Sequence, residues 1–588
     1  MQTAFSAAQL RDPPIANAAA ILKDCVHYGF CTAVCPTYVL LRDENDAPRG
    51  RIDLIRAMLE KGGAPDAKTV LHLDRCLSCN SCMTTCAAKV DYMHLADIGR
   101  AHIERHYRRP LGDRLLRAML VRVLTRPGRF RAAVRAARLA RPAARLLPKR
   151  LRALVALAPA QLPPGSDAVR VGIHPAEGAR RLRAALLTGC LQQAMAPRIS
   201  AATIRLLTRH GCEVVVADTG CCGALPQHMG KEERAKGLAR TAIGAWRAAE
   251  RDGAFDAIVV NASGCGTTVK DYGKLFKHDA GMTEAAQAIA SRALDVTELV
   301  HWIGLKAPAR RIPLAVAYHD ACSLQHAQKV IAPPRDLLRA AGFRVLEVPE
   351  RHFCCGSAGT YNMLQPDIAE ALGRRKAAHI AATGGAVIAA GNLGCMTQIG
   401  LYADVPIVHT AELLDWATGA RASSAAGCTR PRRSLRSRPQ QAAEEPARQG
   451  QARALHDIWM AETRNDAEAA FDAFLERYGV KRERAVECLN KDRDALLAFY
   501  DFPAEHWKHL RTTNPIESAF ATVRHRTIRS KGCLSNKTAL AMIFKLAQSA
   551  ETSWHRLRGY NQLPKIIMGV KFTDGIEVVT SQSQAAAA

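Results

Sequence analysis

Seven cysteines near the start of the sequence have the spacing of iron–sulfur ligands. Four of them form the run C-x2-C-x2-C-x3-C: Cys76, Cys79, Cys82 and Cys86. In this pattern three thiolates bind three corners of one cubane, while the fourth is held apart and ligates a second cluster. An earlier run contains Cys25, Cys31 and Cys35 followed by Pro36. It repeats the same pattern with one change, because Tyr28 stands where the second cysteine belongs. The double motif predicts two iron–sulfur clusters, with a zinc site or unrelated thiols as the alternatives.

An exchange of the fourth cysteines completes each ligand set. The first cluster takes Cys25, Cys31 and Cys86, and the second, a [4Fe–4S] cluster, takes Cys76, Cys79, Cys82 and Cys35. Tyr28 leaves the first set with three thiolates, so one iron of a cubane there has only solvent as a ligand and is readily lost. We expect either a [3Fe–4S] cluster, whose potential differs from that of a cubane, or a labile and empty site.

A second group of cysteines occurs twice along the chain. The first copy consists of Cys190, Cys221, Cys222 and Cys265, and the second of Cys322, Cys354, Cys355 and Cys395. Corresponding positions are offset by 132, 133 and 130 residues, and a glycine follows each adjacent pair. The agreement of three offsets indicates two tandem copies of one domain.

Short apolar runs alternate with alanine-rich helical stretches between residues 183 and 415, as in parallel α/β units. The predicted strands are residues 183–189, 213–220, 256–263, 314–320, 343–349 and 385–392. Each ends within a few residues of a cysteine, so the four thiols of each copy should gather at the carboxyl edge of a sheet, where such folds place ligands.

The paired cysteines must lie on a turn to converge, and the following glycine permits one and allows backbone N–H groups to approach sulfur. We interpret each set as an iron–sulfur or related redox centre, with a dithiol relay or structural zinc as alternatives. His319 and His326 near Cys322 are candidate further ligands, although polar residues at strand ends more often have ordinary partners. Cys212 is expected to be an ordinary buried thiol.

The composition indicates a multidomain globular protein. The chain has 588 residues, 19 cysteines and a formal net charge of +28. Half of that charge lies in residues 101–152, where 16 Lys and Arg oppose only Glu104 and Asp113. We interpret this segment as a solvated helical connector, or as a docking face for an acidic partner or an anionic lipid surface. No signal-peptide pattern or spanning helix is evident, so we expect a cytoplasmic protein whose thiols stay reduced.

The character of the chain changes after the second cysteine repeat. Residues 419–455 are rich in Arg, Ala, Pro and Gln, which predicts a disordered linker. Beyond it, tryptophans reappear and helical periodicity strengthens. We therefore expect a separate, mostly helical module over residues 456–580.

The order of motifs resembles one known family. The strings VHYGFCTAVCPTYVLLRDENDAPRGRIDLI, LDRCLSCNSCMTTC, CSLQHAQK and FCCGSAGTYN are similar to the glycolate oxidase iron–sulfur subunits, and the resemblance covers roughly residues 15–418. The sequence bears a more distant resemblance to the subunits of heterodisulfide reductase and anaerobic glycerol-3-phosphate dehydrogenase that contain the Cys-Cys-Gly (CCG) motif. The resemblance implies an electron-transfer subunit that accepts electrons from a flavin-containing partner oxidising a 2-hydroxy acid. It passes them to a membrane quinone or another acceptor, which suggests a peripheral position on the inner face of the membrane.

The C-terminal module resembles the end of a mutator-type (IS256-like) transposase through the string HWKHLRTTNPIESAFATVRHRTIRSKGCLS. Such enzymes hold two metal ions with three carboxylates, and the resemblance makes Glu517 the third of these. Arg524, seven residues on, would lie on the same helical face as Glu517. Arg526, Arg529 and Lys531 would contact DNA phosphates. The region that supplies the first two aspartates is absent, so Glu517 is vestigial and no strand transfer is expected, only weak nonspecific DNA binding.

These observations predict six segments. They are a helical ferredoxin-like iron–sulfur domain (1–110), a basic helical connector (111–180), two α/β CCG domains with mainly parallel sheets (181–305 and 306–418), the linker (419–455) and the transposase fragment (456–580). Two alternative functions remain: a non-functional fusion with a DNA-binding remnant, and a thiol–disulfide redox subunit of the heterodisulfide-reductase kind.

Overall fold

The computed structural model describes residues 1–142, 148–159, 161–164, 166, 169–309, 313–419, 457–458, 460–478, 490, 493–510 and 560–578. The chain divides into two compact units, residues 1–430 and 431–588, and each is considered by itself. Among the helices within these ranges, none is both long enough and apolar enough to cross a bilayer.

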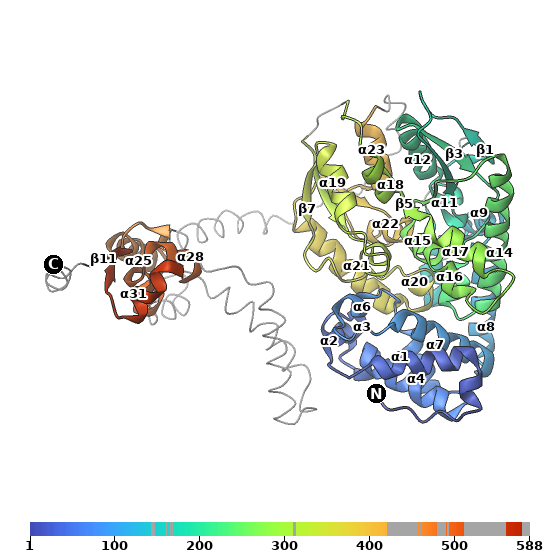
Figure 1. Cartoon of the computed structure of the whole chain (residues 1–588), viewed down its shortest axis with the longest axis horizontal. Helices are drawn as coiled ribbons and strands as arrows, with labels where there is room; N and C mark the ends of the chain where they lie inside the picture. Colours follow the sequence, from blue (N-terminus) through green and yellow to red (C-terminus); the bar gives the residue numbers. More distant parts are fainter. Residues whose placement is uncertain are drawn as a thin grey trace. The chain divides into compact units, whose positions relative to one another are not determined.

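The first region of the larger unit is helical (Figure 1). Its helices are α1 (Pro13–Asp24), α2 (Phe30–Ala33), α3 (Pro36–Leu41), α4 (Pro48–Lys61), α5 (Ala67–Asp74), α6 (Ser81–Thr85) and α7 (Tyr92–His106), with short 3-10 turns η1 (Gln9–Arg11) and η2 (Glu44–Asp46). Proline opens α1, α3 and α4, where its fixed φ suits the first helical turn. Asp66 caps α5 by accepting from the backbone N–H of Thr69 at 2.6 Å. These local signals set the loops between helices, and the cysteines lie in those loops or at helix ends.

Three helices follow in the predicted connector: α8 (Leu111–Leu124), α9 (Pro127–Leu139) and α10 (Lys149–Leu157). Part of the basic charge around the start of α8 is buried in ion pairs of Arg109, which precedes this helix, and of Arg117, which lies in it. Asp74 pairs with Arg109 at 2.5 Å and with Arg117 at 2.9 Å, and both arginine side chains are under 10 % exposed. The start of the connector is therefore fixed to the N-terminal helices.

Two sheets that share a four-strand order form the centre of the unit, and the first has an additional edge strand, β1. The first consists of β1 (Gly172–His174), β2 (Leu182–Leu187), β3 (Cys212–Val216), β4 (Ala257–Val260) and β5 (Ala293–Asp295), in the order β1-β3-β2-β4-β5. The second consists of β6 (Ala315–His319), β7 (Arg344–Glu347), β8 (Val387–Ala390) and β9 (Ile407–His409), in the order β7-β6-β8-β9. All pairings are parallel except that of β1 with β3. The two domains are thus structural copies.

All six strands predicted from the sequence are present, and β1, β5 and β9 were missed. The first of these, β1, lies inside the predicted connector 111–180, so the end of that segment belongs to the first sheet. The other two are three residues long and run directly into helices, where Asp295 and His409 act as N-caps within capping boxes.

Helices cover both sheets. Around the first lie α11 (Cys190–Met195), α12 (Pro197–Arg209), α13 (Ala224–His228), α14 (Glu232–Ala249), α15 (Ser263–Lys270), α16 (Tyr272–Leu275), α17 (Thr283–Ser291) and α18 (Val296–Ile303), with η5 (Glu250–Asp252). Around the second lie η6 (Ser323–Ala327), α19 (Ala332–Ala340), α20 (Tyr361–Leu364), α21 (Pro366–Ala381), α22 (Leu393–Gly400) and α23 (Thr410–Ala417). One apolar core contains buried residues of both domains, among them Leu186, Leu207, Tyr318 and Leu414. The two copies therefore share a core.

The smaller unit, in its described part, contains α25 (Arg464–Tyr478), α27 (Arg493–Leu497), η7 (Ala498–Asp501), η8 (Ala504–His506), α28 (Trp507–Leu510), η9 (Tyr560–Gln562), α31 (Leu563–Ile567) and the hairpin β10 (Phe572–Thr573) and β11 (Ile576–Glu577). Phe471, Phe499 and Tyr500 lie at the centre of a small apolar cluster. The predicted linker beyond Gly419, and Glu517 with Arg524, Arg526, Arg529 and Lys531, lie outside the described residues.

His94 of α7 joins the N-terminal helices to the first α/β domain. Its ring lies 2.7 Å from Asp91 and 3.0 Å from Asp271, which follows α15. Burial alone would lower the pKa of His94, but the hydrogen bonds to these two carboxylates outweigh it and raise the pKa to about 10. The protonated ring therefore stabilises this contact.

The pKa of His94 predicts a pH-dependent stability. Since the folded pKa is above the ordinary 6.5, the stabilisation is complete below pH 6.5 and is lost as pH rises through 10. The stability advantage of the parent over His94→Gln should therefore shrink by about 1.4 kcal/mol for each pH unit in that window. Anaerobic urea denaturation at pH 6.5, 7.5 and 8.5 measures it, with His102→Gln as the control. If the difference in unfolding free energy between the parent and His94→Gln stayed constant from pH 6.5 to pH 8.5, the raised pKa of His94 would be contradicted.

Candidate iron–sulfur sites

Cys25, Cys31 and Cys86 surround a cavity of about 40 Å³ in the N-terminal helical region. Cys25 directly follows α1, Cys31 lies in α2, and Cys86 directly follows α6, which packs against α2. Burial, together with the neighbouring thiols, raises the pKa of Cys31 to about 12. The three predicted ligands of the first cluster are therefore brought together, and they are close enough to influence one another's ionisation.

Tyr28 forms part of the wall of this cavity. Its side chain is 50 % exposed and stacks on Phe30, with ring centroids 5.6 Å apart and planes inclined by 16°. Gly29, which follows, has a φ of +78° and begins α2. A phenol packed in this way does not fill the space between the thiols, so the three-cysteine set is preserved beside it.

Cys35, Cys76, Cys79 and Cys82 surround a second cavity of about 20 Å³. Ser78 and Asn80, between these cysteines, have φ values of +50° and +58°, which turn the backbone around the cavity. The N–H of Ser78 and the hydroxyl of Tyr92 both donate to Cys76 Sγ, each at 3.5 Å. Such donors stabilise thiolates that ligate a cluster.

Arg51 supplies a buried positive charge to the second site. Its guanidinium donates to the backbone oxygen of His72 at 2.7 Å and pairs with Asp46 at 3.2 Å, and it lies 3.9 Å from Cys35 Sγ. Burial would raise the pKa of Cys76, but the charges of Arg51 and Arg100 outweigh it and lower that pKa. The donors and the charge fit an anionic iron–sulfur cluster.

The four cysteines of the first α/β domain also converge. Cys190 begins α11 after β2, Cys221 and Cys222 follow β3, and Cys265 lies in α15 after β4. The neighbouring thiols Cys190 and Cys222 lie close enough to Cys221 that their hydrogen bonding lowers its pKa. Gly223 has a φ of +88°, and a Cβ there would lie 2.8 Å from the Ala235 carbonyl oxygen. Glycine is therefore required to turn the cysteine pair.

The second α/β domain repeats this arrangement with added polar contacts. Cys322 and Cys354 have their sulfurs 3.8 Å apart. The N–H of Gly356 donates to Cys354 at 3.4 Å, and the amide of Asn392 donates to Cys395 at 3.3 Å. Gly356 has a φ of +90°, matching Gly223 in the first copy.

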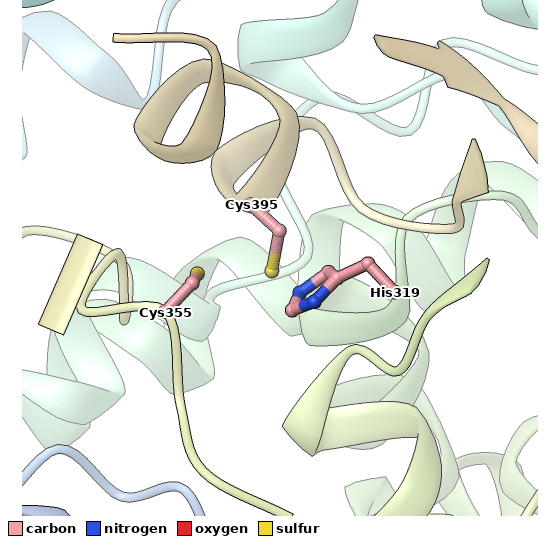
Figure 2. A group of neighbouring side chains, drawn as sticks. All are labelled: His319, Cys355 and Cys395. Atoms are coloured by element: carbon pink, nitrogen blue, oxygen red, sulfur yellow. The ribbon is translucent and has the colours of Figure 1, made fainter. Parts of the chain in front are cut away.

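His319 joins the thiols of the second copy. At the end of β6, its ring faces Cys395 of α22, while Cys355 comes from the loop opposite (Figure 2). One potential ligand atom from each of the three lies within 4.8 Å of the others. The side chain is 1 % exposed, neither ring nitrogen has a hydrogen-bond partner among the residues that the structure describes, and burial lowers its pKa to about 3. A neutral, unpartnered imidazole beside two thiols is suited to ligate a metal.

His326 has a different environment. It bonds to the Thr84 hydroxyl at 2.9 Å and to the His352 backbone oxygen at 3.1 Å. It therefore links α6 of the N-terminal region to the second α/β domain as an ordinary polar residue. Cys212 lies fully buried in β3, apart from both thiol sets.

The second cavity lies next to the second α/β domain. Cys79 shares an apolar cluster with Cys354, and Cys322 packs against it. Burial, and next to it the neighbouring Cys322, raise the pKa of Cys79. This adjacency of two separate cysteine sets was not predicted, because nothing in the spacing of either motif encodes it.

The comparisons with known proteins agree with this geometry. A 4Fe-4S dicluster domain model matches residues 24–90, and a cysteine-rich domain model matches residues 184–270 and 316–400. The chain is 40% identical over 418 residues to the glycolate oxidase iron-sulfur subunit of Escherichia coli strain K12, covering 71% of this chain and 99% of that protein. It is 32% identical over 430 residues to a probable glycolate oxidase iron-sulfur subunit of Bacillus subtilis, covering 68% and 95%.

The C-terminal residues match a different group. A model of Mutator-family transposases matches residues 437–556. The chain is 53% identical over 131 residues to the transposase of insertion sequence element IST2 from Acidithiobacillus ferrooxidans, covering 22% of this chain and 44% of that protein. The chain thus spans less than half of this transposase.

Proposed function

The chain belongs to the family of glycolate oxidase iron–sulfur subunits, and we propose that it carries electrons from a flavin-containing partner to a terminal acceptor through its cysteine sites. It is an electron-transfer component of an oxidoreductase complex, and the 2-hydroxy acid binds on the partner. One observation supports the route best: the second N-terminal site and the cysteines of the second α/β domain share one apolar cluster. Electrons would pass between these two sites.

The first N-terminal site holds a [3Fe–4S] cluster in this proposal. Cys25, Cys31 and Cys86 remain grouped around their cavity, and Tyr28 lies at its wall without occupying it. A three-thiolate set retains three irons more readily than four. The second site, with Cys35, Cys76, Cys79 and Cys82, holds a [4Fe–4S] cluster.

Each α/β domain holds a further iron–sulfur centre. The four thiols of each copy lie at the carboxyl ends of the strands, and both copies have glycine at the same turn. In the second copy His319 supplies an additional ligand beside Cys355 and Cys395. When bound, these centres supply one-electron redox chemistry, while the chain orders the ligands and excludes water.

Reduction by substrate tests this function. The anaerobically purified full chain is mixed with the flavin-containing subunits and glycolate, and the visible absorbance of the clusters is followed. The proposal predicts bleaching that requires both the partner and glycolate. If a dithiol reductant bleaches the clusters and glycolate with the partner does not, the thiol–disulfide alternative is favoured instead.

The transposase-like tail contributes no strand transfer in this proposal, since Glu517 is without the two other carboxylates that a two-metal site needs. Its basic residues bind DNA weakly and without sequence preference. Such binding would fall steeply with added salt, because it depends on displacing counterions from phosphates.

A further inference from the structure

A cavity of about 540 Å³ lies between the connector helices and the two α/β domains, the second of which contributes residues of α20 and α22. Its walls come from α8, α9 and α10 on one side, with side chains such as Leu120, Phe130 and Leu154. On the other side are the cysteines of the first copy: Cys190, Cys221, Cys222 and Cys265. A redox centre held by these thiols would occupy only one end of this space.

The size and lining of the cavity fit a small organic ligand. Binding pockets for such molecules typically measure about 300–1,000 Å³ and are mainly apolar with a few polar groups. Here the helices contribute almost only aliphatic and aromatic side chains, including three alanines of α9, Ala133, Ala136 and Ala137. The ligand should therefore have a large apolar body.

Three polar side chains at the wall have an unused hydrogen-bonding atom. Gln192 Oε1, Asn362 Oδ1 and His228 Nδ1 are buried and have no partner in the described part of the chain. Gln192 and Asn362 are at least nine-tenths buried, and their amide nitrogens are already engaged with Asn261 and Gln398 respectively. Because unpaired buried polar atoms are costly, the two amide oxygens indicate a ligand that can donate hydrogen bonds, and His228 Nδ1 can donate to it or accept from it according to its tautomer.

The outer face of the same helices is suited to a membrane surface. Leu111, Leu115 and Leu139 are 73%, 71% and 84% exposed, and exposed arginines such as Arg114 and Arg138 lie among them. Exposed leucines flanked by basic residues are typical of helices that lie in a lipid interface. Met119 and Leu151 are both exposed and part of the cavity lining, so the cavity reaches this face.

We propose that this cavity binds a membrane quinone, which is reduced there by the centre of the first cysteine set. The quinone ring and the start of its isoprenoid tail occupy the apolar volume. A quinone oxygen accepts from His228 Nδ1–H, and the hydroxyls of the reduced form donate to Gln192 Oε1 and Asn362 Oδ1. Two electrons from the flavin partner and two protons from water convert the two carbonyls to hydroxyls, and no bond to the protein forms. This inference rests on the proposed function for its supply of electrons.

Binding of decylubiquinone to the oxidised, cluster-loaded full chain tests the site without any electron transfer. Ala137→Trp places an indole in the cavity, and Ala132→Trp adds the same ring to the same helix at an exposed position outside the lining. We expect saturable binding to the parent, at least tenfold weaker binding to Ala137→Trp, and a change of less than twofold for Ala132→Trp. The iron content of both variants is measured to show that their iron–sulfur clusters are present.

A second variant tests the site without adding a bulky side chain to the cavity. His228→Leu removes one hydrogen bond and should weaken binding roughly three- to tenfold. No saturable binding to the parent, or equal binding to Ala137→Trp and Ala132→Trp, would overturn the site. Since no substrate or partner is present, failure here leaves the glycolate-dependent bleaching experiment intact as a separate test of the proposed function.

Discussion

Replacing Cys79 with alanine should remove the second cluster and lower glycolate-driven electron transfer by at least about 100-fold, since losing even an indirect contact to a metal ligand typically costs 10–100-fold. Cys79 is the member of the second site that packs with Cys354 of the second α/β domain. Its loss therefore removes a ligand and also interrupts the contact through which electrons would leave the cluster. Iron content and the rate of cluster bleaching measure both effects.

Cys212→Ala is the matched control for this change. Cys212 is also a buried thiol, but it lies in β3 and contacts none of the ligand sets. We expect its iron content to equal that of the parent, with a modest loss of stability from the smaller side chain. A similar loss of iron in both variants would show that general damage, rather than ligation, explains the Cys79 result.

Replacing Arg51 with leucine should destabilise the N-terminal helical region by about 3–5 kcal/mol, the usual cost of removing one partner of a buried ion pair. Arg51 is 1% exposed and its partner Asp46 is fully buried. Arg75 still reaches Asp46 at 2.9 Å, so the lower part of the range is expected. Because Arg51 also lowers the pKa of Cys76, the variant should lose the second cluster more readily.

Arg56→Leu makes the same change on the same helix, α4. Arg56 is 34% exposed and pairs with Asp53 at 3.5 Å, an arrangement worth about 0–1 kcal/mol. Anaerobic urea denaturation of both variants, with iron content measured in parallel, distinguishes them. Equal destabilisation of the two variants would refute the role assigned to Arg51.

Much of the fold followed from local sequence signals. The strands that carry apolar runs, such as β2 and β4, are recognisable because both faces of a central parallel strand are buried. β1 carries no such signal, because it is an edge strand with two of its three residues exposed. β5 and β9 are too short to show a pattern before the helices that follow them begin.

The candidate sites could be predicted from the sequence only where the spacing of the cysteines along the chain indicates which of them share a site. The thiols of each motif come together as their spacing predicts, because a cluster dictates the separation of its ligands. His319 was weighed as a ligand only from its nearness to Cys322 in the sequence, whereas its orientation toward Cys395 depends on the order of strands β6 and β8. The contact of Cys79 with Cys354 and the cavity beneath α8–α10 depend on how domains pack, which no local pattern specifies.

Electron paramagnetic resonance of the anaerobically purified full chain, as isolated and beside Tyr28→Cys, tests the central claim most directly. If Cys25, Cys31 and Cys86 hold a cluster, the parent shows the signal of an oxidised [3Fe–4S] centre. In the variant that signal disappears as a fourth thiolate completes a cubane, and the iron content rises. Absence of the signal in the parent, with iron bound at the first site only in the variant, would contradict the account, since Cys25, Cys31 and Cys86 would then hold no cluster in this protein.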